Sequence, residues 1–292
     1  EYRAEGGRIG RAVLDHETAD PGGQTVLAAG PWATGAARRS WTSTTGMPRP
    51  GACWISMRLA HMFNKLSRLF DQAVTIARLP VVRLEFHLAL NPEHVQKVYR
   101  YYTRPHPRYW VFPNKSIGAA LVDLTRFRDR DDYAQAIKGQ HGVARHVRRA
   151  RERGYTVIEI DRNDFVDDIF DINTSEDMRQ GRPMDADYRT RKTSYASEAN
   201  FKYYGVLNGA GKLVAYGEVG FYGNFAAFNR VIGMRNNDGI NHLMVTEIIS
   251  RLIEAQRYDY FMYDTYFGAS EGLRTFKKML GFKPYRAKYS IR

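Results

Sequence analysis

Apolar residues recur every three or four positions over 57–78, MRLAHMFNKLSRLFDQAVTIAR, and this spacing predicts an amphipathic helix. Its remaining positions include several Arg and Lys residues. Such a helix normally packs on its own domain, but the basic side leaves peripheral membrane contact through 57–78 open. Short apolar runs punctuated by prolines then predict strands at 81–90, 109–112 and 119–124.

Residues 130–153 are predicted as one basic helix that ends at Gly154. The side expected to pack on the domain carries Tyr133, Ile137, Ala144 and Val147. The segment KGQHGVARHVRRARERG (138–154) is rich in Arg and Lys and runs directly into a predicted core strand. Its charge could hold a phosphate-bearing substrate or lie on an ordinary solvated helix face.

Beyond residue 154 the pattern alternates between strands and helices. The predicted order is strand 155–161, helix 164–178, a polar loop, two or three antiparallel strands in 201–234, helix 240–257, strand 258–266, helix 271–280 and strand 283–291. Asn208-Gly209-Ala210-Gly211 is typical of a hairpin turn, and Asn163 or Asp164 is expected to cap the first helix. This order predicts a mixed α/β domain.

Composition supports a folded, basic protein. Of 292 residues, 43% are hydrophobic and 13% aromatic, which excludes a wholly disordered chain. Residues 1–56 lack periodicity and are expected to be a disordered or non-native arm, with Met57 as the alternative start; an irregular ordered arm is the other interpretation. The net charge of +13 and the pI near 9.8 favour anionic partners such as nucleic acid, nucleotide phosphates or an acidic membrane surface.

The cysteine and histidine content limits the chemistry. The single cysteine, Cys53, excludes an internal disulfide framework and a cysteine-based zinc site, and suits a reducing compartment such as the cytoplasm. No apolar run approaches the roughly 20 residues that span a bilayer. His141 and His146 miss the spacing of a helical metal pair, His242 is as suited to a cap as to catalysis, and no His-Glu-x-x-His is present. We therefore expect no metal.

The order of elements resembles that of the GNAT acyltransferase fold over residues 155–292. Two segments add to the likeness: LVDLT…YAQAIKGQHGVARHVRRARERGYTVIEID (121–161) and GASEGLRTFKKMLGFKPY (268–285) are similar to segments of Fem-type and CelD-like acyltransferases. The resemblance implies a mostly antiparallel central sheet flanked by helices, preceded by a reduced N-terminal half (57–130) and a basic linker helix (131–154). It also implies direct acyl transfer to an amine, without a covalent enzyme intermediate.

A phosphate cradle for the donor is predicted in the loop between a strand and a helix. The loop offers Arg235, Asn236, Asn237, Gly239 and Asn241, and a helix N-terminus attracts anions. Asp238 and Ile240 occupy the two glycine positions of the GNAT pyrophosphate loop, and Asp238 would repel a phosphate. This departure disfavours ordinary acetyl-CoA and leaves an acyl carrier or an aminoacyl-tRNA open. A plain capped turn is the alternative, and Lys277 and Lys278 of the last helix are further phosphate candidates.

Candidate catalytic residues lie on two strands. Glu218 sits in an apolar, aromatic run, where burial would disfavour its charged form and suit it to accept a proton; pairing with a nearby arginine is the alternative. Tyr263 and Asp264 end the strand at which this fold opens its cleft, and Tyr263 could protonate the leaving group.

Candidate substrate-binding residues are all basic or polar. The loop residues Arg179, Gln180 and Arg182 suggest an acceptor or donor with a carboxylate or phosphate, because Arg binds these groups bidentately; a solvated loop is the alternative. The basic helix contributes Arg145, Arg148 and Arg149.

Three functions remain open from the sequence. The first is an N-acyltransferase that uses acyl-CoA or an acyl carrier as a co-substrate and a small-molecule or peptide amine as the acceptor. The second keeps the fold but takes aminoacyl-tRNA as the donor. The third is a non-catalytic RNA- or membrane-binding protein, which would account for the charge but not for the segments that resemble acyltransferases.

Overall fold

The structure is a computed structural model that describes residues 74–107, 112–139, 142–179, 182–236 and 238–292. The chain divides into two units, Glu1–Ala77 and Arg78–Arg292. The arm expected at 1–56, most of the helix expected at 57–78 and most of the strand expected at 109–112 lie outside the described residues. The second unit holds the central sheet and its helices.

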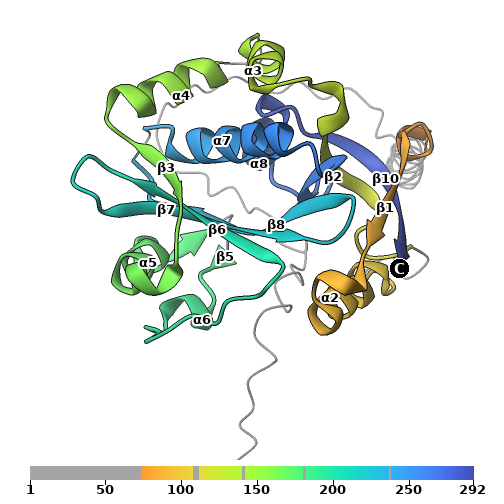
Figure 1. Cartoon of the computed structure of the whole chain (residues 1–292), viewed down its shortest axis with the longest axis horizontal. Helices are drawn as coiled ribbons and strands as arrows, with labels where there is room; N and C mark the ends of the chain where they lie inside the picture. Colours follow the sequence, from red (N-terminus) through yellow and green to blue (C-terminus); the bar gives the residue numbers. More distant parts are fainter. Residues whose placement is uncertain (1–73, 108–111, 140–141, 180–181, 237) are drawn as a thin grey trace, which may run out of the picture. The chain divides into compact units, whose positions relative to one another are not determined.

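An eight-stranded sheet forms the centre of this unit, in the order β1-β10-β2-β9-β8-β7-β6-β3 (Figure 1). The strands are β1 (Val81–Phe86), β2 (Ile117–Asp123), β3 (Thr156–Glu159), β6 (Phe201–Leu207), β7 (Leu213–Phe221), β8 (Phe225–Gly233), β9 (Tyr260–Thr265) and β10 (Lys283–Ile291). β1 with β10 and β8 with β9 are parallel, and the other neighbours are antiparallel. The expected mixed, mostly antiparallel fold is confirmed.

Helices cover both faces of the sheet. They are α2 (Pro92–Thr103), α3 (Arg130–Lys138), α4 (Val143–Glu152), α5 (Val166–Thr174), α6 (Ala186–Arg189), α7 (Ile240–Ala255) and α8 (Glu271–Met279). In Figure 1, α7 and α8 lie on one face, while α2, α5 and α6 lie on the other. Helices α3 and α4 pack on the outer side of α7, which explains why α7 is apolar nearly all round.

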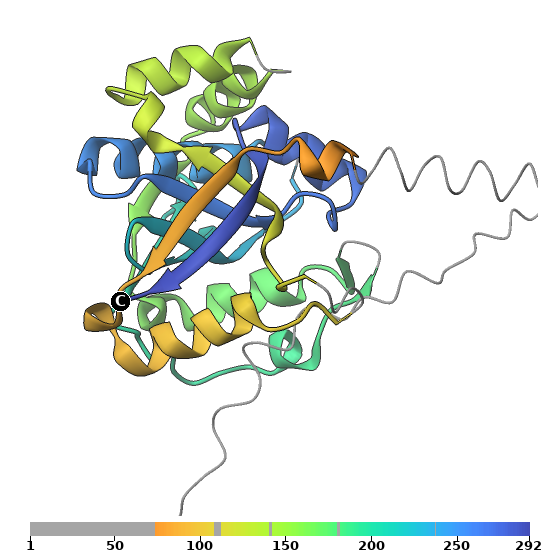
Figure 2. The same ribbon diagram turned by 90° about the vertical axis from the view of Figure 1, so that its right-hand side faces the viewer.

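Strands from the region 78–130 belong to the same sheet as the C-terminal strands. β1 runs beside β10, and β2 pairs with both β10 and β9 (Figure 2). The hairpin between β6 and β7 turns at Asn208, whose Oδ1 accepts hydrogen bonds from the backbone N–H groups of Ala210 and Lys212. The strands, α7, α8 and this hairpin follow the order predicted from the hydrophobic pattern.

Helix α2 was not predicted, because the prolines of 81–124 were interpreted only as turn signals. The structure instead uses Asn91 and Pro92 to start a helix. Asn91 Oδ1 accepts a hydrogen bond from His94 N, and Pro92 occupies the first helical position, where its missing N–H costs nothing.

The single helix predicted at 130–153 is wrong, since α3 and α4 are separate. Gly139 follows α3, and Gly142 precedes α4 with φ +87°, a left-handed conformation that suits glycine. Ala144 is exposed rather than packed, whereas Val143 and Ala150 are buried. The break rotates α4 relative to a continuous helix and so changes which positions face α7.

The predicted capping of the next helix is also wrong. Asp161, not Asn163 or Asp164, supplies the capping side chain: its Oδ1 accepts a hydrogen bond from Asn163 N and begins a 3-10 turn, Arg162–Phe165. α5 follows directly on this turn and has no side-chain cap of its own. The expected polar loop after α5 contains the short strands β4 (Met178–Arg179) and β5 (Arg182–Pro183), and α6.

Candidate functional site

The parallel strands β8 and β9 pair over only part of their length. Their register joins Phe225, Ala226 and Ala227 to Tyr260, Phe261 and Met262. Beyond Ala227 and Met262 the two strands no longer pair, so 228–233 of β8 and 263–265 of β9 have no ladder between them. We call this region the strand opening.

A β-bulge lies at the edge of the strand opening. On β8, Phe228 pairs with Val219 and Arg230 pairs with Glu218, so Asn229 is the extra residue between two register pairs. A bulge leaves one residue outside the ladder and redirects its side chain, and bulges are common beside active sites. Asn229 is exposed.

Asp264 is the last residue but one of β9 and has a strained conformation at the strand opening. Its φ is +52°, which is uncommon for a residue other than glycine. Its Oδ1 accepts a 2.5 Å bond from Lys115 Nζ; the Lys115 side chain is 6% exposed and that of Asp264 37%. Lys115 also lies 5.5 Å from the centre of the Tyr101 ring. The sequence singled out Asp264 but not Lys115, which precedes β2 in an unremarkable Pro-Asn-Lys-Ser stretch.

Tyr263 faces the opposite side of the sheet from Asp264 and packs among aromatic rings. Its ring centre is 5.1 Å from that of Phe228 and 5.7 Å from that of Phe282. Lys277 of α8 is buried, donates from Nζ to the Thr265 carbonyl at 2.7 Å and lies 4.9 Å from the Tyr263 ring centre. Tyr263 and Lys277 therefore meet at the end of β9.

Lys278 does not join this group. It is exposed on α8, whereas its neighbour Lys277 is buried. Successive helical residues point about 100° apart, so the two lysines cannot both reach one bound phosphate in the way that the sequence suggested.

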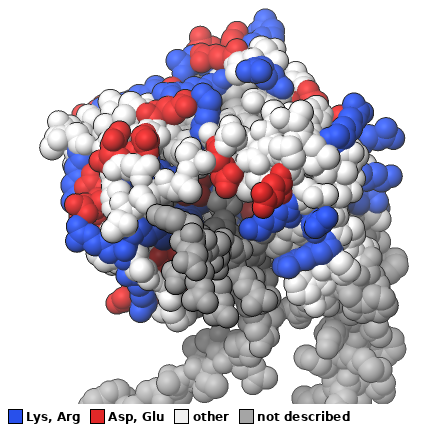
Figure 3. Space-filling model, turned by 60° about the horizontal axis from the view of Figure 1, so that its bottom comes forward, with Lys and Arg blue, Asp and Glu red and all other residues white. Residues whose placement is uncertain are grey.

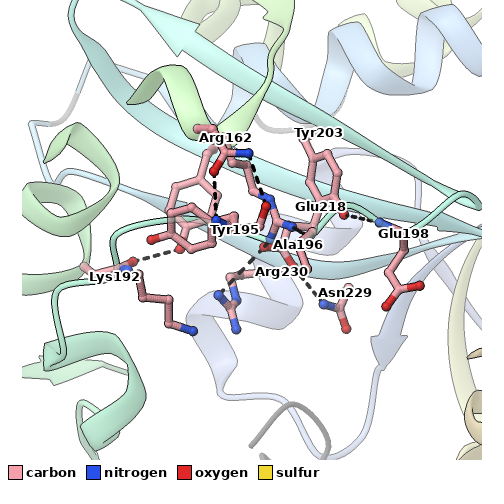
Figure 4. Close-up of polar contacts among 12 residues, drawn as sticks. Arg162, Lys192, Tyr195, Ala196, Glu198, Tyr203, Glu218, Asn229 and Arg230 are labelled. Atoms are coloured by element: carbon pink, nitrogen blue, oxygen red, sulfur yellow. Dashed lines mark hydrogen bonds and ion pairs between the residues drawn. The ribbon is translucent and has the colours of Figure 1, made fainter. Parts of the chain in front are cut away.

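Glu218 has the arginine partner that was the alternative interpretation of this residue. Its side chain is 4% exposed; Oε1 accepts a 2.8 Å hydrogen bond from Arg162 Nη1, and Oε2 accepts one of 2.8 Å from Asn229 Nδ2 (Figure 4). Arg230 Nη1 lies 3.8 Å from the same Oε1. The Arg162 guanidinium also stacks at 3.9 Å on the Tyr203 ring. Both oxygens of the Glu218 carboxylate are therefore held by neighbouring side chains.

Arg162 also lines a pocket of about 390 Å³ at the end of β3. The walls are charged and aromatic, and include Glu159, Asp161, Arg162, Tyr195, Lys202 and Tyr203. Two of the charges already pair with each other, because Lys202 Nζ is 2.9 Å from Glu159 Oε2. Arg162 and the aromatic rings beside it therefore form one wall of a small polar pocket.

The loop predicted as the phosphate cradle is held by the chain itself. Arg235 pairs with Glu176 at 2.9 Å, and Asn236 Nδ2 donates to the Tyr155 hydroxyl at 3.1 Å. Asp238 is buried, forms an ion pair with Arg153 and accepts a 2.8 Å hydrogen bond from Tyr155. Arg153 thus compensates the negative charge that the sequence suggested would repel a phosphate.

Helix α4 packs closely on the start of α7. Gly239 has φ +83°, and a Cβ added there would lie 2.5 Å from the His146 carbonyl oxygen. Asn241 follows in the first turn of α7, and its buried Oδ1 has no hydrogen-bond partner among the described residues. Ile240, which occupies the second glycine position of the GNAT pattern, is a core residue with 2% of its surface exposed. Asn237 lies outside the described residues.

Two histidine rings join α4 to α7. His146 and His242 stack with their centres 4.4 Å apart and their planes at 10°. Burial lowers the pKa of His242 to about 4, with His146 adding to the effect. Burial also lowers the pKa of His146, helped by Arg145 and Arg149. The pair is therefore neutral near pH 7 and packs as an aromatic contact rather than as a cap.

The arginines predicted for substrate binding come from two elements, α4 and the β4–β5 hairpin. Arg145 and Arg148 are exposed on α4, where Arg148 pairs with Glu152 at 3.4 Å, and Arg149 is half-buried beside His146. Arg179 and Arg182 lie opposite each other in the β4–β5 hairpin; their side chains and Gln180 lie outside the described residues.

Two structural features are absent from the described part of the chain. Within it, no three His, Cys, Asp or Glu residues are grouped as a metal would require. No helix there is long and apolar enough to cross a bilayer.

Comparison with known proteins shows a likeness at the level of fold. The C-terminal domain of a putative lysylphosphatidylglycerol synthetase from Agrobacterium fabrum aligns with 57% of this chain and 57% of its own, at 18% identity and a TM-score of 0.41. FemX aligns with 57% of this chain and 59% of its own, at 11% identity and a TM-score of 0.42.

A tandem GNAT protein from the clavulanic acid biosynthesis pathway aligns with 59% of this chain and 51% of its own, at 18% identity and a TM-score of 0.38. This chain therefore spans less than two thirds of the length of each of these proteins. No known family profile matches the sequence, and no curated protein does either.

Proposed function

We propose that this protein is an N-acyltransferase that moves an acyl group from a thioester to an amine. The strand opening is the observation that carries the proposal. Unpaired backbone groups on β8 and β9 can bind an extended chain that has amide groups, in the manner of an added strand. The pantetheine arm of CoA or of an acyl carrier is such a chain, and its thioester would lie between the strands.

The transfer needs no enzyme nucleophile. The amine nitrogen attacks the thioester carbonyl carbon, the C–N bond forms as the C–S bond breaks, and a proton passes from the amine to the departing thiolate. We assign Asp264 to orient the amine and accept its proton, because this carboxylate, although bound by Lys115, is 37% exposed at the strand opening, whereas Glu218 is 4% exposed.

The other candidates at the end of β9 take supporting roles in this proposal. The bulge at Asn229 leaves backbone N–H capacity beside the reacting carbonyl, which suits it to stabilise the oxyanion. Lys277 holds the Thr265 carbonyl and so fixes the edge of the strand opening. Tyr263 lies beside it and remains the candidate to protonate the thiolate.

The alternative donor is an aminoacyl-tRNA. The exposed Arg145 and Arg148 on α4 favour it, because phosphate contacts from arginines supply most non-specific RNA affinity. Against it, the face in Figure 3 shows Lys and Arg interspersed with Asp and Glu over the described residues, without one continuous basic surface. An added strand also suits an amide-bearing arm better than a ribose end.

Mass spectrometry of reaction mixtures tests the proposal. Acyl-CoA, acyl carrier and charged tRNA would each be offered with a panel of amines. We expect amide products from a pantetheine thioester, with turnover unaffected by ribonuclease. Loss of all transfer after ribonuclease treatment would instead establish the tRNA donor. Absence of amide product from every donor would reject acyl transfer and leave the non-catalytic class.

A further inference from the structure

Two buried guanidinium groups share one carboxylate on the α5 face of the sheet. The side chains of Arg162 and Arg230 are each 11% exposed, and that of Glu218 is 4% exposed. Arg162 hydrogen-bonds Glu218 Oε1 at 2.8 Å, whereas Arg230 Nη1 is 3.8 Å from that oxygen, too far for a hydrogen bond. The Glu218 charge is thus matched by Arg162, and the three residues carry one positive charge in excess.

The other neighbours of Arg230 do not supply the missing negative charge. Its guanidinium lies 4.6 Å from the Tyr188 ring centre and shares a hydrogen bond with the Tyr216 hydroxyl. Burial alone would lower the pKa of Arg230, but the Glu218 carboxylate together with Tyr216 and Tyr188 raises it, so Arg230 is charged. Nearby Asp187 already pairs with Lys192 at 3.0 Å.

A buried charge that lacks a counter-ion of its own costs free energy, and binding sites are where such a cost is retained. Among the described residues, Arg230 has only the Glu218 carboxylate that Arg162 already binds. Asn229, the exposed bulge residue next to Arg230 in sequence, donates one N–H of Nδ2 to Glu218 Oε2 at 2.8 Å, and a primary amide carries a second N–H that can donate to a ligand. In Figure 4, Arg162 lies above Glu218, while Arg230 and Asn229 lie below it.

From this charge excess we infer that Arg230 and Asn229 bind a carboxylate of the acceptor, so that the amine substrate is an amino acid or another amine that bears a carboxylate. The inference rests on the proposed function, because the bulge that carries Asn229 borders the strand opening. An acceptor held here by its carboxylate would have its amine close to the thioester.

The single excess positive charge of Arg162, Arg230 and Glu218 also favours a carboxylate over a phosphate. A carboxylate brings one negative charge, which equals the excess. A phosphate monoester brings about 1.5 to 2 negative charges at pH 7, and it would lie against the Glu218 carboxylate. Arginine and amide donors also match the two oxygens of a carboxylate in geometry.

Binding of matched ligands to the full chain tests the inference. Alanine, lysine and glutamate would each be compared with the corresponding α-carboxamide by calorimetry and by thermal shift, without any acyl donor. We expect at least one of the acids to bind at least about tenfold more tightly than its carboxamide, which is the range of a charge-assisted bond. Inorganic phosphate is expected neither to bind comparably nor to displace the acid.

Three variants separate a binding role from a structural one. Arg230→Met is expected to abolish the preference for the acid while keeping or raising the melting temperature, since it removes the excess charge. Arg230→Lys retains the charge without the planar fork and is expected to lose most of the preference. The matched control is Arg126→Met, an exposed arginine paired with Asp123, and it is expected to behave as the wild type.

Several results would overturn the inference. One is that no acid in the panel binds more tightly than its carboxamide; others are that phosphate binds as well, or that Arg230→Met keeps the preference. Failure of the proposed function is distinguishable, because ligand binding is measured without a donor. Acid-selective binding without any turnover would reject acyl transfer and keep the site, whereas turnover without acid preference would reject only the site.

Discussion

At the residue scale, the pair of Lys115 and Asp264 gives the site its most specific constraint. Asp264 holds a left-handed backbone conformation that costs of the order of 1 kcal/mol, and it does so at a strand end bound to a buried ammonium group. A strained backbone conformation persists in a folded protein only where contacts with the surrounding residues enforce it. Here Lys115 is the group that fixes the carboxylate.

This pair predicts an asymmetry between two substitutions. Asp264→Asn would leave Lys115 buried without its carboxylate, so we expect the free energy of unfolding to fall by about 3 kcal/mol and turnover to fall at least about 100-fold. Lys115→Met would leave the Asp264 carboxylate without its partner, but this carboxylate is partly exposed to water. The loss of stability should therefore stay below about 1 kcal/mol, while turnover still falls. Urea denaturation and steady-state kinetics measure the two effects.

Lys115→Arg is the conservative control and should recover part of the turnover. Equal losses of stability in Asp264→Asn and Lys115→Met would contradict this account, in which the buried Lys115 needs the Asp264 carboxylate more than Asp264 needs Lys115. Unchanged turnover in Lys115→Met would show that Asp264 is not positioned by this contact.

Glu218 gives a second prediction at this scale. Glu218→Gln leaves Arg162 and Arg230 without a counter-charge, so we expect the free energy of unfolding to fall by roughly 3 kcal/mol. Because Glu218 is not the base in this account, the pH profile of kcat/KM should keep its shape in the folded fraction. Disappearance of the acidic limb of the profile, where a carboxylate base would become protonated, would return Glu218 to the catalytic role.

The sequence identified Glu218, Tyr263, Asp264 and Lys277 because charge or a hydroxyl in an apolar run is a strong local signal. It could not identify Lys115, Arg162 or Arg230 as their partners, because those contacts join residues 149, 56 and 12 positions apart in the chain. Only the bulge on β8, invisible in the hydrophobic pattern, makes Asn229 the extra residue beside Arg230.

At the element scale, α4 is part of the folded core rather than a free basic arm. Arg151 pairs with Glu247 of α7 at 3.4 Å, Arg153 pairs with Asp238, and His146 stacks on His242. The long helix expected from composition is broken by glycines, which no apolar spacing revealed. The predicted order of strands and helices after residue 154 was correct because each segment carries its own periodicity.

The histidine contact predicts that stability depends on pH. The pKa of His242 is about 4 in the folded protein and 6.5 in the unfolded chain, so the unfolded state binds more protons between these values. Stability should therefore fall as the pH decreases from 6.5 to 4, by up to about 3 kcal/mol from this group. Urea denaturation at a series of pH values measures it.

His242→Phe is the informative variant, because it keeps a ring between His146 and Phe276 but cannot bind a proton. Its free energy of unfolding should vary less between pH 6.5 and pH 4 than that of the wild type. An identical pH dependence would mean that other groups cause the effect.

At the scale of the whole described unit, one sheet carries every part of the proposed site. The regions 78–130 and 155–292 contribute neighbouring strands, with β2 between β9 and β10. Lys115 reaches Asp264 because it leads into β2, so the N-terminal strands position the site as well as extend the sheet. Some of the 44 Lys and Arg residues are paired within the fold, as Arg153 is with Asp238, but such pairs leave the net charge of +13 unchanged.

The central claim is that the acyl donor lies between β8 and β9, and hydrogen–deuterium exchange tests it most directly. The measurement would compare the free protein with the protein saturated by whichever donor supports turnover, in its non-hydrolysable form. We predict slower exchange at the amides of 228–233 and 263–265, and no change in β1 or β10. Protection confined to other segments, with 228–233 and 263–265 exchanging as in the free protein, would contradict the claim.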